Sequence, residues 1–143
     1  GGGIGVRIAD ACEEMGLEVS ELSDSTKMRF AKKFPSFYGI GNPLDLTGSV
    51  RDEEYIISLK DGMKDFDIAI VALLWGPPQL SEGLINKLTE VIKKCKKPVI
   101  ICSPGGAFTK RVNRAFEEKG VPVFTSPESA VRAAAILANT KGK

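Results

Sequence analysis

The stretch Ile68-Ala-Ile-Val-Ala-Leu-Leu74 decides the fold of this chain. It is apolar at every position and far shorter than the roughly 20 residues that cross a bilayer. Strands of this kind are typical of parallel sheets, because helices cover both of their faces. The segment Val99-Ile-Ile-Cys102 has the same character. We expect these two segments to be the central strands of one sheet.

Helix and strand patterns alternate on both sides of this stretch. Apolar residues recur every three or four positions in the expected helices, as at Leu80, Leu84 and Leu88. Strands joined by helices of this length form a parallel sheet through right-handed crossovers. The expected elements are an extended segment near residues 38–46, strands over 67–74, 98–103 and 122–124, and helices over 51–63, 80–94, 107–119 and 127–139. The pattern predicts an α/β fold with a doubly wound, mainly parallel sheet and helices on both faces.

The first 37 residues depart from this alternation. An amphipathic helix ends near Gly16, and a second helix begins at the cap Ser23-Asp-Ser-Thr26 and stops before Pro35. No strand precedes the first helix, although a glycine turn that opens a helix normally follows a buried strand. We therefore expect that the first strand of the sheet is missing from residues 1–143 and that the natural chain begins earlier. The sheet would then have an unpaired edge that invites association with another chain.

Composition limits the class of protein. The 143 residues have the length of one domain, and they are 43% hydrophobic and 27% charged with a net charge of +2. This balance indicates neither disorder nor a nucleic-acid surface, and no signal peptide or membrane span is visible. The three cysteines lack C-x-x-C spacing and are interpreted as reduced, buried thiols of a cytoplasmic protein.

Three glycine-containing turns open helices and are candidate anion sites, because the amides of a helix N-terminus lack partners and carry a positive dipole. The first is Gly1 to Gly5, and it does not fit the dinucleotide-binding spacing. The second is Trp75-Gly-Pro-Pro-Gln79, where two prolines leave Gln79, Leu80 and Ser81 as amide donors. The third, Ser103-Pro-Gly-Gly106, fits a tight connection equally well.

Other candidate residues are few. Asn42 and Asp45 lie in Gly41-Asn-Pro-Leu-Asp-Leu-Thr-Gly48, where the acid either belongs to a site or accepts loop amides, and we favour the second role. Trp75 would stack on a cofactor ring or seal the edge of the core, and the core role is the more common. The chain contains no histidine, so neither a Ser/His/Asp set nor a Cys/His pair can form. We expect neither a metal site nor a catalytic residue in this chain.

Three motifs in order carry a resemblance to a known family. They are Gly1-Gly-Gly-Ile-Gly-Val6 with Ala9-Asp-Ala-Cys12, then Gly16-Leu-Glu-Val19 with Glu21-Leu-Ser23, then Gly41 to Gly48. Together they resemble the NDP-forming acyl-CoA synthetases, which include ADP-forming acetate-CoA ligase and are related to succinyl-CoA synthetase. The resemblance extends to about Asn139. It implies the flavodoxin-like domain on the carboxyl side of the histidine-bearing domain.

The resemblance also implies a function. The family interconverts acyl-CoA, ADP and phosphate with a free acid, CoA and ATP, through an acyl phosphate and a phosphohistidine on a neighbouring domain. This chain would form a wall of the acid and phosphate site facing the phosphohistidine loop, and would be inactive alone. By resemblance, the residues that bind substrate or phosphate are Gly2, Gly3, Asn42, Asp45, Gly76, Pro77, Pro78 and Gln79.

Cofactors and partners follow from the same resemblance. The parent enzyme would use CoA, ADP or ATP and Mg²⁺, none of them bound by this chain alone. Its partners would be the CoA-binding, histidine-bearing and ATP-grasp domains or subunits, with no nucleic acid or membrane. Two departures bear on this: no strand leads into Gly1, and Pro77 and Pro78 stand where succinyl-CoA synthetase has amide-bearing residues.

Two alternatives remain open from the sequence. One is a stand-alone flavodoxin-like module that binds a ligand or a partner without catalysis, since the later strand and helix signals are consecutive. The other is a diverged scaffold paralogue that keeps the interface but not the turnover. Substitution of Asn42 or Gln79 would separate the scaffold from the ligase domain, because a scaffold would lose nothing measurable.

Overall fold

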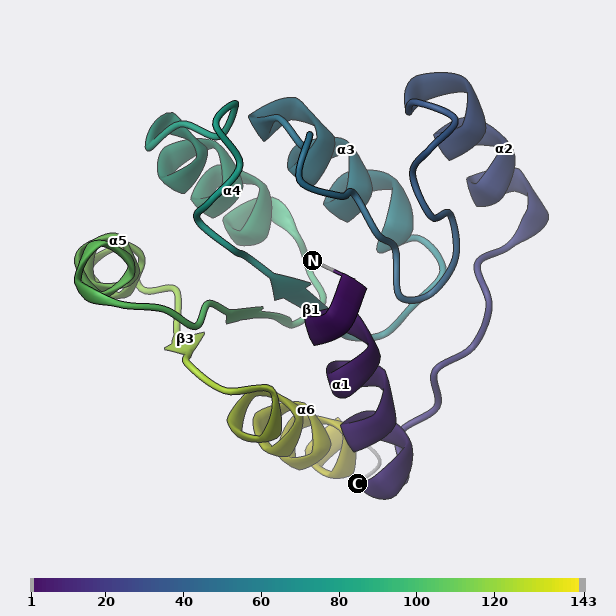
Figure 1. Cartoon of the computed structure of the whole chain (residues 1–143). Helices are drawn as coiled ribbons and strands as arrows, with labels where there is room; N and C mark the ends of the chain where they lie inside the picture. The colour runs from purple at the N-terminus through teal and green to yellow at the C-terminus, as the bar shows by residue number, and fades with distance from the viewer. Residues whose placement is uncertain (1, 142–143) are drawn as a thin grey trace.

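The computed structural model describes residues 2–141, so Gly1 of the first glycine turn lies outside the described part. The fold is α/β, with strands and helices alternating from β1 onward (Figure 1). The described elements are α1 (Gly2–Glu14), α2 (Asp24–Lys33), α3 (Asp52–Gly62), β1 (Ala69–Ala72), α4 (Gly83–Lys94), β2 (Val99–Cys102), α5 (Ala107–Glu118), β3 (Val123–Phe124) and α6 (Pro127–Lys141). The expected α/β class is confirmed.

The sheet within the described residues is parallel and has the strand order β1-β2-β3. Ala69 pairs with Val99, and Ile101 pairs with Val123. Every residue of β2 is buried, which confirms it as the central strand, whereas every residue of β1 is only half-buried. The expectation that both strands are central is therefore wrong for β1, which lies at the edge.

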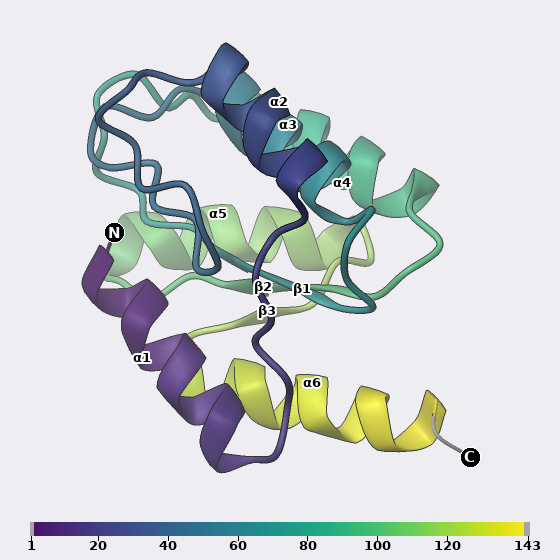
Figure 2. The same cartoon turned by 90° about the vertical axis from the view of Figure 1, so that its right-hand side faces the viewer.

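Helices cover both faces of this sheet (Figure 2). Val99 and Ile101 pack in a core with side chains of α3, α4 and α5. Ile100 and Cys102 point the other way and pack with side chains of α1 and α6. The alternation along β2 explains why a strand that is buried on both faces is apolar throughout.

A third apolar cluster lies beneath α2. It contains Phe30 and Phe34, whose rings stack with centroids 5.0 Å apart, together with Leu22, Tyr38 and Val50. The extended segment expected near residues 38–46 forms only one antiparallel bridge, between Gly39 and Asp45. This segment is consequently a loop on the surface of the cluster.

Local signals explain several helix ends. The hydroxyl oxygen of Ser23 accepts the amide of Thr26 at 3.2 Å, and Ser126 accepts the amide of Ser129 at 3.1 Å. Gly16, just beyond α1, has φ of 77°, a conformation that favours glycine. None of the helices in residues 2–141 combines the length and apolarity required to cross a membrane.

Candidate functional site

The three glycine-containing turns lie along one edge of the sheet, where the strands end. The turns at Trp75 and Ser103 follow β1 and β2 directly. The start of α1 joins them because Arg7 Nη2 lies 3.1 Å from Glu128 Oε1, and α6 begins at Pro127 just after β3. The carboxyl edge of a parallel sheet is where ligands bind in doubly wound folds.

The glycines of the first turn belong to the helix itself. Gly2 and Gly3 are the first residues of α1, so they form its first turn and not the loop that the sequence pattern suggested. Amides in a first helical turn have no partner four residues back, and they sit at the positive end of the helix dipole. Gly3 is exposed, and a Cβ added there would meet nothing within 4 Å. The first turn of α1 is thus exposed at Gly3.

Gly5 brings the first and second motifs together. A Cβ added at Gly5 would lie 3.3 Å from Pro43 Cβ, so glycine lets the Gly41–Gly48 loop pack directly on α1. The sequence reading did not single out Gly5 as a contact residue. The spacing of the glycines was the only sequence feature at Gly5, and it does not indicate that Pro43 is the contact.

Asn42 and Asp45 both hold the loop by hydrogen bonds. Asn42 Nδ2 donates to the carbonyl oxygen of Ser20 at 2.9 Å. Asp45 Oδ1 accepts the amide of Thr47 at 2.9 Å, and Thr47 has φ of 60°. The backbones of Asp45 and Gly39 also exchange two hydrogen bonds of 2.9 Å. Asp45 thus accepts a loop amide, which is the structural role that we favoured from the sequence.

The turn after β1 is held by a carboxylate of the chain itself. Asp52, which is 4% exposed, accepts the amide of Ser81 at 2.9 Å and also accepts the Ser81 hydroxyl. The amide of Leu80 donates to the carbonyl oxygen of Pro77 at 3.2 Å. The expectation that Leu80 and Ser81 offer free amides is therefore wrong, and α4 begins at Gly83 instead of residue 80. Gly76, Pro78 and Gln79 are exposed, and Pro77 is half-buried.

Asp52 was not among the residues expected at the site. It is the first residue of α3, in a first turn that also contains Glu53 and Glu54. Lys87 Nζ lies 3.5 Å from its Oδ2. Acidic residues are common in a first helical turn because they favour the positive end of the helix dipole, so no local pattern points to a partner 29 residues away.

Trp75 and the third turn have structural roles. The Trp75 ring packs edge-on against Phe108 with centroids 6.0 Å apart, and the Arg111 guanidinium lies 5.1 Å from the Phe108 centroid. Gly105 has φ of 151°, and a Cβ there would lie 2.5 Å from Thr109 Oγ1. These contacts favour the core-sealing role of Trp75 and the interpretation of Ser103–Gly106 as a tight connection.

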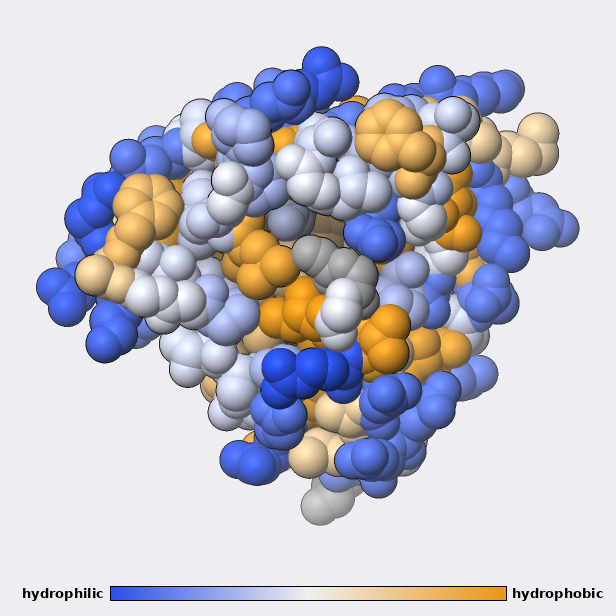
Figure 3. Space-filling view, viewed as in Figure 1, coloured by the Kyte–Doolittle hydropathy of each residue, from blue (hydrophilic) through white to orange (hydrophobic). Residues whose placement is uncertain are grey.

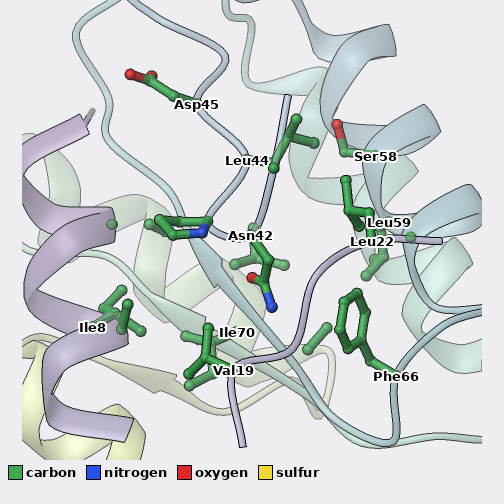
Figure 4. Close-up of a pocket in the computed structure, with 18 of the residues that line it drawn as sticks. Ile8, Val19, Leu22, Asn42, Leu44, Asp45, Ser58, Leu59, Phe66 and Ile70 are labelled. Carbon is green, nitrogen blue, oxygen red and sulfur yellow. The ribbon is translucent and has the colours of Figure 1, made fainter. Parts of the chain in front are cut away.

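A mainly apolar cavity of about 280 Å³ lies beside this edge. It runs between α1 and α3 along β1, and Ile8, Val19, Leu59 and Ile70 point into it (Figure 4). Figure 3 shows the corresponding hollow in the middle of the face, with apolar surface around it. Cys12 also lines the cavity, and burial raises the pKa of its thiol.

The strongest pKa shifts belong to buried tyrosine and cysteine side chains. Burial, followed by the hydrogen bond to Glu54, raises the pKa of Tyr38 to about 12. Burial raises the pKa of Cys102 to about 11, so this thiol is unreactive at neutral pH. Within residues 2–141, no three cysteine or acidic side chains come together as a metal site would require.

Comparison with known proteins gives a consistent result. Residues 1–140 match the profile of the Ligase-CoA domain. The alpha subunit of ADP-forming acetate-CoA ligase I from Pyrococcus furiosus is 32% identical over 143 residues, covering 96% of this chain and 30% of that subunit. The ADP-forming acetate-CoA ligase I of Archaeoglobus fulgidus is 29% identical, covering 95% of this chain and 19% of the relative.

A solved structure agrees in fold. The dinucleotide-forming acetyl-coenzyme A synthetase 1 of Candidatus Korarchaeum cryptofilum superimposes with a TM-score of 0.86 and 25% identity, over 96% of this chain and 31% of that one. The same enzyme has also been solved in complex with phosphate and ADP, with the same TM-score. This chain spans about a third or less of the length of each of these relatives.

Proposed function

This chain belongs to the Ligase-CoA domain family of the ADP-forming acetate-CoA ligases, and we propose that it acts as one domain of such an enzyme. The parent would convert an acyl-CoA, ADP and phosphate into a free acid, CoA and ATP. The observation that carries the proposal is the match over residues 1–140. The absence of histidine from the sequence fits a division of labour in which another domain carries the phosphohistidine.

The proposed role of this domain is to present amide donors to the acid, the phosphate and the phosphohistidine loop. Gly2 and Gly3 would supply first-turn amides of α1 at the carboxyl edge of the sheet, where Gly3 is exposed. Preorganised donors of this kind stabilise a phosphoryl group that moves between sites, because they need not reorient as charge develops. Electrostatic stabilisation is therefore the contribution that we assign to this chain.

The other expected residues support this turn. Asn42 and Asp45 shape the loop that packs on α1 at Gly5, through their bonds to Ser20 and Thr47. The exposed turn from Gly76 to Gln79, with Pro77 and Pro78 inside it, would form a second wall. The amides of Leu80 and Ser81, which follow this turn, already have partners within the chain. The turn would therefore define the shape of the site and not donate these hydrogen bonds.

The remaining parts of the site belong, in this proposal, to other domains. CoA, ADP or ATP and Mg²⁺ would be held by the CoA-binding, histidine-bearing and ATP-grasp parts of a cytoplasmic enzyme. This division agrees with the lengths of the relatives, of which this chain spans 30% and 31% in two cases. The flavodoxin-like form of the sheet is part of the same proposal.

A matched pair of substitutions tests the amide donors. In the assembled enzyme, Gly3→Pro removes one first-turn amide where proline is sterically tolerated, and Gly3→Ala keeps the amide. ATP formation from acyl-CoA, ADP and phosphate should fall at least tenfold with Gly3→Pro and change less than twofold with Gly3→Ala. Equal rates in both variants would exclude this turn from the phosphate site.

The domain assignment has its own test. The other domains should form no ATP until residues 1–143 are supplied. Full activity of those domains alone would refute the assignment. Saturable binding of CoA, a flavin or a nucleotide by this chain, with no partner domain in its genomic frame, would favour the stand-alone module instead.

A further inference from the structure

Two buried carboxylates occupy the first turn of α3. Asp52 is 4% exposed and Glu54 is 3% exposed, whereas Glu53 between them is exposed. Acidic side chains are rarely buried, because removing a carboxylate from water is costly unless partners compensate. Exposed acids already stabilise a helix start through its dipole, so that effect does not explain the burial. The partners of the two carboxylates give the explanation.

Glu54 holds the segment before α3. Its Oε1 accepts the Tyr38 hydroxyl at 2.7 Å and the backbone amide of Arg51 at 2.8 Å. One carboxylate oxygen thus joins both ends of residues 38–51. This segment contains the Gly41–Gly48 loop, so Glu54 fixes the base of that loop to the start of α3.

Asp52 holds the turn after β1. It accepts the amide of Ser81 at 2.9 Å and also accepts the Ser81 hydroxyl, and Lys87 Nζ lies 3.5 Å from its Oδ2. Ser81 lies two residues after the turn from Gly76 to Gln79. The first turn of α3 is therefore bonded to two loops that are distant in the sequence.

The two carboxylates point to different sides of α3. Side chains two positions apart in an α-helix differ in direction by about 200°, because each residue turns the helix by about 100°. This spacing lets Asp52 reach forward along the chain to Ser81 while Glu54 reaches back to Tyr38. Glu53, between them, contributes to neither bond and is a natural control.

Apolar side chains bring the same two loops together. Leu80, next to Ser81, packs against the cluster that contains Leu46 and Val50. Leu46 belongs to the Gly41–Gly48 loop, and Val50 is 1% exposed just before α3. Apolar attraction is non-directional, whereas hydrogen bonds have narrow limits of distance and angle. The carboxylates therefore fix the relative placement of loops that the apolar contacts only bring together.

The loop held by Glu54 also packs on α1. A Cβ added at Gly5 would lie 3.3 Å from Pro43 Cβ, and Leu44 of the loop lies between α1 and α3 (Figure 4). Contacts thus run from the start of α1 through the Gly41–Gly48 loop and the first turn of α3 to the turn after β1. These are the segments to which the proposed function assigns the acid and phosphate site.

We propose that Asp52 and Glu54 are positioning residues for this site. They set the distance between two of its walls, the Gly41–Gly48 loop and the Gly76–Gln79 turn, without touching substrate. A misplacement of about 1 Å can lower a rate about a hundredfold, so the pair acts on turnover through geometry. This inference rests on the proposed function and deepens it by naming the residues that hold the walls in register.

Matched substitutions in the assembled enzyme test this role. Asp52→Ala and Glu54→Ala remove the acceptors, Asp52→Asn and Glu54→Gln keep an acceptor oxygen, and Glu53→Ala is the exposed control. ATP formation from acyl-CoA, ADP and phosphate is measured well below the thermal midpoint of each variant, and kcat/KM is determined for phosphate and for ADP.

The two kcat/KM values separate positioning from folding. A loss of folded enzyme lowers both values equally, whereas misplaced walls lower the value for phosphate alone, because ADP is held by other domains in the proposed function. The alanine variants should lower kcat/KM for phosphate at least about tenfold and leave the value for ADP within about twofold. The Asn and Gln variants should restore most of the loss, and Glu53→Ala should change neither value by more than about twofold.

Two smaller changes serve where an alanine variant does not fold. Ser81→Ala and Tyr38→Phe each remove one hydroxyl that a carboxylate accepts. Each should lower kcat/KM for phosphate at least about threefold and leave the value for ADP unchanged. Adding Ser81→Ala to Asp52→Ala should cause no further loss, since the two side chains act through one contact.

Two results would overturn the proposal. One is an equal fall of kcat/KM for phosphate and for ADP in the alanine variants, which indicates loss of folded enzyme alone. The other is an unchanged kcat/KM for phosphate in Asp52→Ala and Ser81→Ala while Gly3→Pro still lowers activity, which leaves the proposed function standing without this role. Full ATP formation by the other domains without this chain is a separate result that refutes the proposed function and this inference together.

Discussion

Asp52 at the start of α3 holds Ser81 at the turn before α4, accepting both its amide, at 2.9 Å, and its hydroxyl. The contact joins two segments 29 residues apart and fixes the turn that follows β1. It also places a carboxylate of the chain beside amides that an anion would otherwise use. The Ser81 amide is thus already bonded within the chain, whereas Gly3 in the first turn of α1 is exposed.

Removing the Asp52 carboxylate should loosen this turn. Asp52→Ala removes the charged acceptor of the Ser81 amide and hydroxyl, two part-buried hydrogen bonds, which costs about 1–3 kcal/mol of stability. Urea unfolding monitored by the fluorescence of Trp75, the single tryptophan, measures the loss. Glu53→Ala, at the exposed neighbour, is the matched control and should change stability by less than about 0.5 kcal/mol. Equal stability of the two variants would show that the clamp contributes nothing.

The two tyrosines should resist ionisation at high pH. The pKa values of Tyr38 and Tyr55 are raised to about 12, mainly by burial. The unfolded chain ionises tyrosine near pH 10, so their contribution to stability is complete below about pH 10 and is lost as pH rises toward about 12. Absorbance at 295 nm should show little tyrosinate in the folded chain at pH 10.5. A titration with a midpoint near 10 in the folded chain would contradict this account.

The cap of α2 should make stability depend on acid pH. The Ser23 amide donates to Asp65 at 2.9 Å, and this bond is the main cause of the lowered pKa of Asp65. Because the folded pKa is depressed, the contribution is present above about pH 4 and is lost as pH falls through the folded pKa. Asp65→Asn should therefore narrow the difference between urea midpoints at pH 6 and pH 3. Asp67→Asn, at an exposed carboxylate two residues later, should leave the difference unchanged.

Two adjacent glycines should respond differently to alanine. Gly105 has φ of 151°, and an added Cβ would lie 2.5 Å from Thr109 Oγ1, whereas a Cβ at Gly106 would meet nothing within 4 Å. Gly105→Ala should destabilise the chain by about 1–3 kcal/mol, and Gly106→Ala should be nearly neutral. Thermal unfolding of both variants measures the contrast. Equal midpoints would mean that the third turn does not need this backbone conformation.

The sequence predicted the elements whose signals are local. The strand at Val99–Cys102 was predicted to within one residue at each end, because burial on both faces makes it apolar throughout. The start of the helix at Pro127 was predicted at the correct residue, because the Ser126 cap directly precedes it. The start of α4 was placed three residues early, since Asp52 holds Ser81 outside the helix and no local signal records that contact.

The edge position of β1 and the roles of Asp45 and Gly5 illustrate the same limit. The apolar run at residues 69–72 predicted an interior strand, but β1 is an edge strand of the described sheet. The sequence left two roles for Asp45, a site residue or an acceptor for loop amides. The bond to the Thr47 amide shows the second role. Contacts between distant segments, such as Gly5 with Pro43, require the folded chain.

The central claim, that this chain is a domain of an ADP-forming acyl-CoA synthetase, is tested most directly on the native polypeptide that contains residues 1–143. It would be captured from its source cells, its mass and associated subunits determined, and the eluate assayed for CoA-dependent formation of ATP from acyl-CoA, ADP and phosphate. The account predicts a longer chain or a complex that carries this activity. A lone, inactive chain of 143 residues would contradict it.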